Sequence, residues 1–315
     1  MKKDSKIYIT GSTGMVGRSL MKDLKSKGFN NLLTLSSKKL DLRNRNATFK
    51  FFKKKRPEYV FHAASKVGGI KASMDDPVGF LRDNLLINVN VIDACYKFKV
   101  KKLVNLGSSC IYPKETAQPM KEKNLLSSKF EPTNEGYSLS KICSLKLCEY
   151  YNKKKGTNFI SLMPPNLYGE YDKFDKEKSH VIGALIMKIH AAKIEEKKEV
   201  EIWGTGNAKR EFMYVGDISK AMIFAMENLN KEDLWEQGFL NTGTGNEVTI
   251  KKLANLIKKV VGFKGKLIFD KTKPEGVLKK LMDSSLFLKK GFKPEVKLEV
   301  GLKKAYKYYL FKINN

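Results

Sequence analysis

The sequence is poor in the residues that build disulfide frameworks and metal sites. Four cysteines, three histidines and two tryptophans occur in 315 residues. The cysteines, at positions 95, 110, 143 and 148, show no C-x-x-C spacing and are not accompanied by histidines in a zinc pattern. We therefore expect neither a disulfide framework nor a metal ion, which fits a protein of the reducing cytoplasm.

Long apolar stretches are missing as well. No run of membrane-spanning length occurs, and the first ten residues lead into Ile7-Tyr8-Ile9 without the apolar core of a signal peptide. We therefore expect a soluble, cytoplasmic protein with no membrane partner.

Acidic residues are scarce. The chain has 33 of them against 61 lysines and arginines, which gives a net charge of +28. Such an excess is compatible with nucleic-acid binding. The lysines, however, are spread along the whole chain without the interleaved aromatic residues of a single-strand binding groove. We interpret them as solvated surface residues, expect no specific nucleic-acid partner, and note that the charge would help to attract an anionic substrate such as a nucleotide diphosphate.

Short apolar runs alternate with amphipathic stretches in the first half, a pattern typical of a parallel sheet with helices on both faces. The expected strands are 6–10, 32–35, 59–62, 102–106 and 159–162, and the expected helices are 16–27, 47–55, 78–98 and 137–155. After residue 164 we expect polar connections around 168–178 and 204–210, strands at 200–203 and 239–242, and helices at 180–193, 218–228, 250–261 and 300–310.

The expected fold class is therefore α/β. A Rossmann-type, doubly wound parallel sheet is expected in residues 1–165, completed by about 214–242. A smaller C-terminal α/β lobe for the substrate is expected in residues 166–213 and 243–315.

The long helices expected at 78–98 and 137–155 carry apolar residues on more than one face, including Leu86, Val89, Leu147 and Tyr150. Pairing across a dimer axis as a four-helix bundle is one explanation, and burial beneath the sheet is the other. We expect a homodimer.

A glycine-rich segment follows the first expected strand and opens the first expected helix. It reads Gly11-Ser12-Thr13-Gly14-Met15-Val16-Gly17. Glycines at this spacing let the backbone turn tightly and approach a pyrophosphate, whose charge then meets the helix N-terminus. Because a strand precedes it and a helix follows, the segment predicts a dinucleotide site rather than a merely structural turn.

The residues after the second strand indicate which dinucleotide fits. Ser36-Ser37-Lys38-Lys39 follows this strand, and no carboxylate stands where one would bind the adenosine ribose of NAD. Lys38, with the serine hydroxyls, could receive a 2′-phosphate instead, so we expect NADP. Asp41 comes later and is expected to approach the adenine edge.

A tyrosine and a lysine four residues apart, Tyr137 and Lys141, should lie side by side on one helix. There the ammonium is expected to lower the pKa of the phenol and ready it for proton transfer. Ser108, at the end of the preceding strand, can hold the same substrate oxygen. These three residues predict carbonyl reduction beside a nicotinamide.

Further motifs lie between residues 64 and 212. They are Ala64-Ser65-Lys66-Val67-Gly68-Gly69-Ile70, Gly107-Ser108-Ser109-Cys110-Ile111-Tyr112-Pro113-Lys114, Glu131-Pro132-Thr133-Asn134-Glu135, Asn166-Leu167-Tyr168-Gly169, Ser179-His180-Val181-Ile182, and Trp203-Gly204-Thr205-Gly206 followed by Arg210-Glu211-Phe212. With these motifs the chain resembles the GDP-L-fucose synthase family of extended short-chain dehydrogenases/reductases.

The resemblance implies an NADPH-dependent enzyme that epimerises C3 and C5 of GDP-4-keto-6-deoxy-D-mannose and then reduces C4. A C4 ketone acidifies the neighbouring C–H bonds, so inversion needs a base, an acid on the other face, and donors that hold the enolate oxygen. By position, Cys110 and His180 are the implied base and acid, while Ser108 and Tyr137 hold the oxygen. The competing interpretation of Cys110 is a small buried hydrophobe.

The same resemblance implies the binding residues. The expected cofactor contacts are Gly11, Ser12, Thr13, Gly14, Met15, Val16, Gly17, Lys38, Asp41, Leu42, Ala63, Ala64, Lys141, Pro164, Asn166, Leu167 and His180. The expected contacts to the GDP-sugar are Lys188, Trp203, Arg210, Glu275 and Lys280, with Arg210 suited to the diphosphate. For Lys188 and Lys280 a plain surface position is the alternative, because lysines are so numerous. The other histidines, His62 and His190, are expected to be structural.

Some positions depart from the family pattern. Thr13 stands where arginine often helps to hold the 2′-phosphate, so the preference for NADP rests on Lys38. The others are Gly136 for proline, Pro165 for threonine, Lys188 for arginine and Glu275 for aspartate. Because most of these lie on the substrate side, a sugar other than the family's usual one stays open.

Two rival functions remain. One is C4 reduction of a related GDP-4-keto sugar, such as a GDP-4-keto-heptose, without epimerase activity. The other is a non-catalytic dinucleotide-binding sensor or scaffold, against which the intact set of Ser108, Tyr137 and Lys141 argues.

Overall fold

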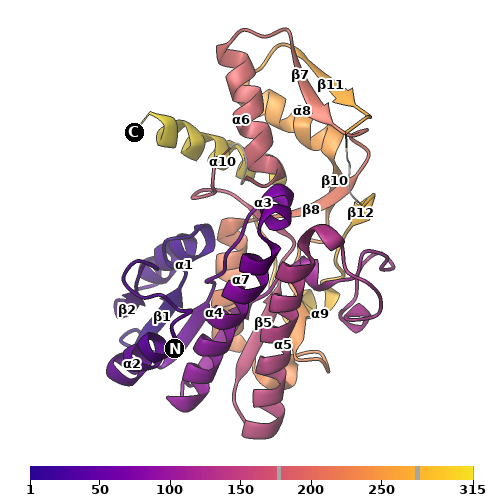
Figure 1. Ribbon diagram of the computed structural model, residues 1–315. Helices are drawn as coiled ribbons and strands as arrows, with labels where there is room; N and C mark the ends of the chain where they lie inside the picture. The colour runs from indigo at the N-terminus through magenta and orange to yellow at the C-terminus, as the bar shows by residue number, and fades with distance from the viewer. Residues whose placement is uncertain (176–178, 274–276, 315) are drawn as a thin grey trace.

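The main body of the protein is a six-stranded parallel sheet with the order β2-β1-β3-β4-β5-β9 (Figure 1). The computed structural model describes residues 1–175, 179–273 and 277–314. The strands are β1 (Ile7–Thr10), β2 (Leu32–Thr34), β3 (Tyr59–His62), β4 (Lys102–Leu106), β5 (Phe159–Met163) and β9 (Phe239–Asn241). The expected Rossmann-type parallel sheet is confirmed.

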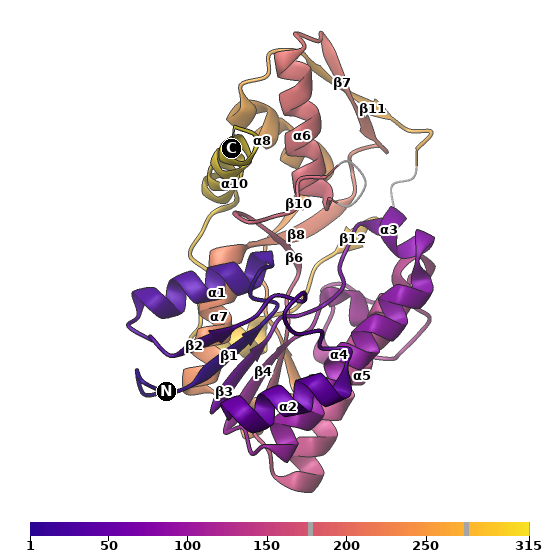
Figure 2. The ribbon, with the colours of Figure 1, turned by 60° about the vertical axis from the view of Figure 1, so that its left-hand side comes forward.

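Helices cover both faces of this sheet (Figure 2). One face carries α1 (Met15–Ser26) and α7 (Val215–Asn228), and the other carries α2 (Arg45–Lys55), α4 (Pro77–Lys97) and α5 (Glu135–Lys155). Because side chains alternate along a strand, Ile7 and Ile9 pack into the core with α1 and α7, whereas Tyr8 packs into the core with α2 and α4. In the described ranges no helix is both long and apolar enough to cross a lipid bilayer.

Local chemistry fixes the ends of the helices. The Asn44 side chain caps α2 by accepting a hydrogen bond from the Ala47 backbone N–H, and Asp76 caps α4 in the same way from Gly79. Pro77 occupies the first position of α4, where its fixed φ suits a helix. The helix α5 ends at Gly156, which has a left-handed φ of 65°.

A second α/β group lies above the sheet in Figure 1. Its strands β6 (Asn166–Tyr168), β8 (Lys209–Tyr214), β10 (Glu247–Thr249) and β12 (Lys279–Lys280) form one small sheet, and β7 (Glu199–Trp203) pairs with β11 (Lys266–Asp270). The helices are α6 (Val181–Ile194), α8 (Ile250–Val261) and α10 (Leu298–Ile313), with short α3 (Ile70–Asp75) and α9 (Ser285–Lys289) elsewhere. One hydrophobic cluster runs from Ile160 and Met222 of the main body to Ile186 and Leu253 of this group, so the two parts share a core.

The expected polar connections at 168–178 and 204–210 are wrong in part, because β6 and β8 begin or end inside them. The start of β8, Lys209-Arg210-Glu211, has no apolar alternation. Its backbone nevertheless pairs with β10 on one side and with β12 on the other, and this ladder makes it a strand. The elements α3, β10, β11, β12 and α9 were not expected either.

The order of the sheet places a switch point at β1. The chain leaves β1 for β2 on one side and later returns to β3 on the other side. In open α/β sheets, ligands bind in the crevice beyond the carboxyl ends of the strands at this point. The loops that follow β1 and β3 therefore define where a candidate site should lie.

Candidate active site

The glycine-rich loop packs directly against the residues that follow β3. Gly11 has a left-handed φ of 67°, and a Cβ placed there would lie 2.8 Å from the Ala64 nitrogen. The Thr10 hydroxyl accepts hydrogen bonds from the Ala63 and Ala64 backbone N–H groups at 3.2 and 3.1 Å. Only glycine fits at position 11, and the two strand ends at the switch point are held together.

The rest of this loop fits the expected dinucleotide cradle. Gly14 is the N-cap of α1 and is exposed, and among the described residues a Cβ there would meet only the Gly11 carbonyl oxygen, at 3.3 Å. Gly17 packs so closely on Gly11 that a side chain would collide with it. Ser12 donates to the Leu35 carbonyl at 3.3 Å and so ties the loop to the end of β2. A pyrophosphate would meet backbone N–H groups and the positive end of α1 here.

The three expected cofactor contacts after β2, Lys38, Asp41 and Leu42, differ in their exposure and in their partners. Lys38 is exposed in a turn. The Asp41 carboxylate is held by Arg43, whose Nε and terminal nitrogen donate to it at 3.0 and 2.8 Å. These hydrogen bonds lower the pKa of Asp41. Leu42 is buried in the core beneath α4. Asp41 therefore contacts Arg43, and Leu42 contacts the hydrophobic core.

Ser108, Tyr137 and Lys141 converge at the end of β4. Ser108 follows this strand and its hydroxyl accepts a hydrogen bond from the Cys110 backbone N–H at 3.2 Å. Tyr137 and Lys141 lie in the first turns of α5, with the Lys141 Nζ 5.7 Å from the centroid of the phenol ring. Lys141 Nζ donates to the Leu106 carbonyl at 2.8 Å. The structure thus brings together the three residues that the sequence predicts for carbonyl reduction.

The expected lowering of the Tyr137 pKa is wrong for the protein as it stands. Burial raises this pKa, the neighbouring Cys110 raises it further, and the hydroxyls of Ser65 and Ser108 act in the opposite direction. Burial also lowers the pKa of Lys141 to about 8, against an opposing effect of Cys110. The spacing of Tyr137 and Lys141 on a helix predicts that the two side chains are close together. It does not predict their desolvation, which is the largest influence on both pKa values.

Cys110 is the meeting point of two distant segments. Asn134, just before α5, donates its Nδ2 to the Cys110 sulfur at 3.6 Å. Lys280, on β12, donates its Nζ to the same sulfur at 3.8 Å from a position 170 residues away in the chain. Lys280 was expected to contact the sugar, and the structure places it beside the implied base.

The other expected substrate residues lie around the second α/β group. His180 is exposed at the start of α6, yet surrounding protein atoms partly desolvate its imidazole, and together with Lys173 they lower its pKa. Lys188 is exposed on α6, Trp203 is 59% exposed at the end of β7, and Arg210 is half-buried on β8. Glu275 lies outside the described residues.

The segment after β5 connects the two parts. The Pro164 carbonyl accepts a hydrogen bond from the Ser109 backbone N–H at 2.9 Å, which fixes the Ser108 segment against it. Asn166 donates its Nδ2 to the Glu211 carbonyl at 3.1 Å, and Leu167 follows it on β6.

Two residues near the site were missed. Ser65 directly follows Ala64 and its hydroxyl donates to the buried Asn84 side chain at 2.8 Å, beside Tyr137. Glu211 is 1% exposed, and its carboxylate accepts hydrogen bonds from the backbone N–H groups of Thr244, Gly245 and Met282 at 2.6, 2.8 and 3.1 Å. Glu211 thereby holds the segment before β10 and the segment after Lys280 to β8. Both residues stood inside quoted motifs, which was the only signal for them.

The remaining histidines have structural surroundings. His62 is buried between the Thr10 hydroxyl, at 2.7 Å, and the Asn88 side chain, at 3.0 Å. Burial lowers its pKa to about 3, so its ring is neutral. His190 contacts the Tyr306 hydroxyl at 3.0 Å.

A glycine-rich loop at the switch point of a parallel sheet, with serine, tyrosine and lysine at the neighbouring strand end, defines a Rossmann-type protein of the short-chain dehydrogenase/reductase class. The model of the NAD dependent epimerase/dehydratase family matches residues 7–236. The chain belongs to this family.

Curated relatives match over nearly the full length. The chain is 46% identical over 309 residues to the probable GDP-L-fucose synthase 1 of Oryza sativa subsp. japonica, with 98% of this chain and 93% of that relative covered. It is 44% identical over 313 residues to GDP-L-fucose synthase 1 of Arabidopsis thaliana, with coverages of 99% and 95%. It is 42% identical over 311 residues to the GDP-L-colitose synthase of Yersinia pseudotuberculosis, with coverages of 98% and 99%.

Solved structures show the same fold. A GDP-6-OMe-4-keto-L-xylo-heptose reductase from Campylobacter jejuni superimposes with a TM-score of 0.95 at 37% identity, covering 100% of this chain and 99% of that one. MlghC, a GDP-mannoheptose C4 reductase from Campylobacter jejuni with NADP bound, gives 0.91 at 37% identity, covering 98% and 99%. A GDP-L-fucose synthetase from Naegleria fowleri bound to NADP gives 0.89 at 28% identity, covering 100% and 97%.

Proposed function

We propose that this protein is an NADPH-dependent GDP-4-keto-6-deoxy-sugar 3,5-epimerase/4-reductase, similar in activity to GDP-L-fucose synthase. The observation that carries the proposal is the convergence of Cys110 and Lys280 with the Ser108, Tyr137 and Lys141 group. A plain reductase needs only the second of these two groups. The full-length likeness to enzymes named for GDP-L-fucose synthesis supports the same substrate class.

The cofactor fits the residues at the switch point. The loop from Gly11 to Gly17 would hold the pyrophosphate, and the end of β2 offers no carboxylate to repel a 2′-phosphate. Two structural neighbours are described with NADP bound. When bound, NADPH supplies the hydride for C4.

In the reduction, the protein itself supplies the proton that the C4 oxygen gains. Tyr137 donates its phenolic proton to the C4 oxygen as the carbonyl becomes an alcohol, and the Ser108 hydroxyl donates a hydrogen bond to the same oxygen. The high pKa of the buried Tyr137 keeps the phenol protonated before the reaction. Charged Lys141 then stabilises the phenolate that remains.

Epimerisation uses the ketone before it is reduced. The sulfur of Cys110 acts as the base and takes the proton from the carbon next to C4, and the electron pair of the broken C–H bond moves to the C4 oxygen as an enolate. Ser108 and Tyr137 hold that oxygen. His180 then returns a proton to the other face of the same carbon. Asn134 and Lys280 aim N–H donors at the sulfur and so fix its position.

C4 reduction of a GDP-4-keto-heptose without epimerisation is the second candidate. It is favoured by the TM-score of 0.95 to a heptose reductase. The two functions share the reductive residues and differ in whether Cys110 moves a proton.

We further propose a cytoplasmic homodimer in which residues 1–165 with 214–242 bind the cofactor and residues 166–213 with 243–315 bind the GDP-sugar. The helices α4 and α5 pack against each other, and Leu86, Val89 and Tyr150 on them are 41%, 38% and 57% exposed. A second copy would cover this apolar strip. Light scattering of the protein and of Val89→Glu tests the dimer: a wild-type monomer would contradict it.

Exchange of substrate hydrogen with D₂O tests the central proposal. Substrate incubated with the protein and NADP⁺, which cannot donate hydride, should gain deuterium at C3 and C5. Cys110→Ser should abolish this exchange and still reduce a substrate that is already epimerised. If the wild-type protein reduces C4 in D₂O without label at C3 or C5, the heptose-type reductase is the correct function.

A further inference from the structure

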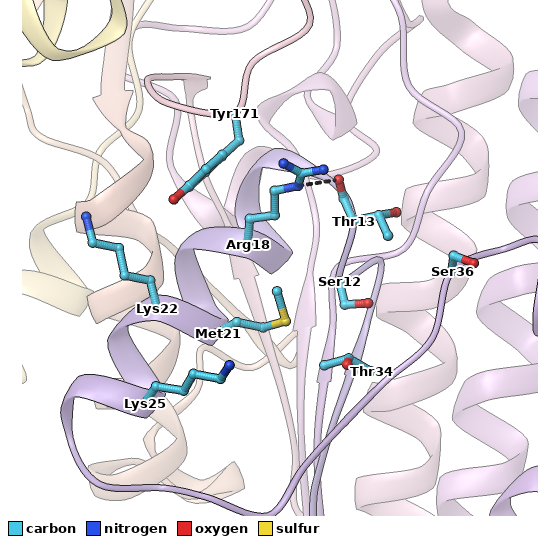
Figure 3. A pocket seen from close by; sticks show the side chains of 9 residues that line it. All are labelled: Ser12, Thr13, Arg18, Met21, Lys22, Lys25, Thr34, Ser36 and Tyr171. Carbon is cyan, nitrogen blue, oxygen red and sulfur yellow. Dashed lines mark hydrogen bonds between the residues drawn. The ribbon is translucent and has the colours of Figure 1, made fainter. Parts of the chain in front are cut away.

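A pocket of about 460 Å³ opens beside the glycine-rich loop (Figure 3). One wall is formed by Ser12 and Thr13 of the loop after β1 and by Thr34 and Ser36 at the end of β2. The opposite wall is the side of α1 that carries Arg18, Met21, Lys22 and Lys25, and Tyr171 lies above in the view. The pocket is thus built from the elements that meet at the edge of the sheet.

The chemistry of the lining favours an anion with several oxygen acceptors. Four hydroxyl groups stand on one wall and three cationic groups on the other, and none of the described residues that line the pocket is acidic. Within the part of the chain that the structure describes, Arg18, Lys22 and Lys25 form no ion pair with a carboxylate. A phosphate monoester matches both walls, because it carries charge and accepts hydrogen bonds from N–H and O–H donors.

Arg18 is held at the rim of this pocket. Its Nε donates to the Thr13 carbonyl at 3.1 Å, and its guanidinium carbon lies 5.6 Å from the centroid of the Tyr171 ring. Figure 3 shows the side chain reaching from α1 across to the loop. Tyr171 itself has a φ of 68°, which is rare for a bulky residue and indicates that its position is constrained.

The position of the pocket identifies the phosphate. In a Rossmann fold the adenosine ribose lies at the end of the second strand, and an arginine nearby accommodates a 2′-phosphate. The end of β2 is one wall here. Lys38, the residue that the sequence predicts for this role, is exposed in a turn and is not among the residues that line the pocket.

We propose that this pocket takes the 2′-phosphate of the adenosine ribose, and that Arg18 rather than Lys38 is the residue that selects NADPH over NADH. Arg18 supplies from the first turns of α1 the guanidinium that Thr13 cannot supply from the loop. The inference rests on the proposed function, because it assigns one part of the cofactor whose use is proposed there.

Binding measurements on matched variants test this assignment. Arg18→Gln removes the charge but keeps an amide donor for the Thr13 carbonyl, and Lys38→Gln is the matched control. Titrations of NADPH and NADH, followed by nicotinamide fluorescence, give the two dissociation constants without turnover. Adenosine 2′,5′-bisphosphate and adenosine 5′-phosphate, followed by calorimetry, isolate the phosphate from the nicotinamide.

We expect Arg18→Gln to weaken NADPH and the bisphosphate about 10- to 100-fold, the range for a charge-assisted hydrogen bond, and to leave NADH and adenosine 5′-phosphate unchanged. An equal or larger loss in Lys38→Gln would overturn the inference. So would an equal loss of both cofactors in Arg18→Gln, because Arg18 would then merely shape the loop. If the wild-type protein binds NADPH no better than NADH, the proposed cofactor itself fails, which is a different result from a preference that survives Arg18→Gln.

Discussion

The burial of Lys141 predicts an alkaline limit on catalysis. Its pKa is lowered from 10.5 to about 8, so the ammonium loses its proton as the pH rises through that value. At about pH 9 roughly one-tenth of Lys141 stays charged, and kcat/KM for C4 reduction should be about tenfold below its neutral plateau. The profile of kcat/KM against pH is the appropriate readout, because it reports ionisations of the free enzyme.

Two variants separate this cause from others. Lys141→Arg keeps its charge at every accessible pH, so its remaining activity should lose the alkaline limb. Lys141→Met should be almost inactive throughout. A wild-type profile that stays flat to about pH 10, or a limb that is unchanged in Lys141→Arg, would refute the reasoning.

The burial of Lys141 should also lower the free energy of unfolding. A lysine pKa lowered from 10.5 to about 8 corresponds to about 3 kcal/mol at neutral pH. Because the folded pKa is the lower one, the unfolded chain binds more protons between about pH 8 and pH 10.5, and this contribution to stability improves as the pH rises through that window. Lys141→Met removes the buried charge but loses the hydrogen bond to Leu106, worth about 1 kcal/mol. It should therefore unfold at higher urea than the wild type, and a lower midpoint would contradict the penalty.

Three other changes follow from the site. Tyr137→Phe removes the proton donor and should lower kcat by about 10²- to 10⁴-fold while NADPH binding persists, as stopped-flow and fluorescence titration would measure. Lys280→Met removes one donor to the Cys110 sulfur and should slow D₂O exchange at C3 and C5 while sparing reduction of an epimerised substrate; equal losses would show a plain binding role. Glu211→Ala strands three buried N–H groups and should lower the free energy of unfolding by about 3–5 kcal/mol in urea, and a loss below about 1 kcal/mol would mean that water replaces the carboxylate.

The buried strands could be predicted because their side chains alone define them. The strands β3 and β4 occur at the predicted residues 59–62 and 102–106, since short segments built around adjacent apolar residues, Val60-Phe61 and Leu103-Val104, are typical of strands buried on both faces. By contrast, β8 begins with Lys209-Arg210-Glu211, and β12 consists of two lysines. The polar start of β8 and the two residues of β12 are strands because a neighbouring backbone pairs with them, and this neighbour is not readable from the local sequence.

In the site, too, contacts within one segment could be predicted from the sequence, whereas contacts between distant segments could not. Proximity within one segment was predictable, so Ser108, Tyr137 and Lys141 meet as expected. The contact between Cys110 and Lys280 joins residues 170 positions apart, and it depends on the pairing of β12 with β8. The predicted shift of the Tyr137 pKa had the wrong direction for a related reason. Burial raises this pKa, and burial depends on all the elements packed around the phenol.

The distribution of the site along the chain bears on how such an enzyme can diversify. Every reductive group, and the cysteine beside it, comes from the single stretch between β4 and the start of α5, whereas the expected sugar-nucleotide contacts come from segments scattered between α6 and β12. Mutations in the later segments can therefore exchange one sugar for another while the reaction at C4 stays intact. Such changes would spare the groups that reduce C4, whereas His180 and Lys280, which serve the proposed epimerisation, lie in these later segments.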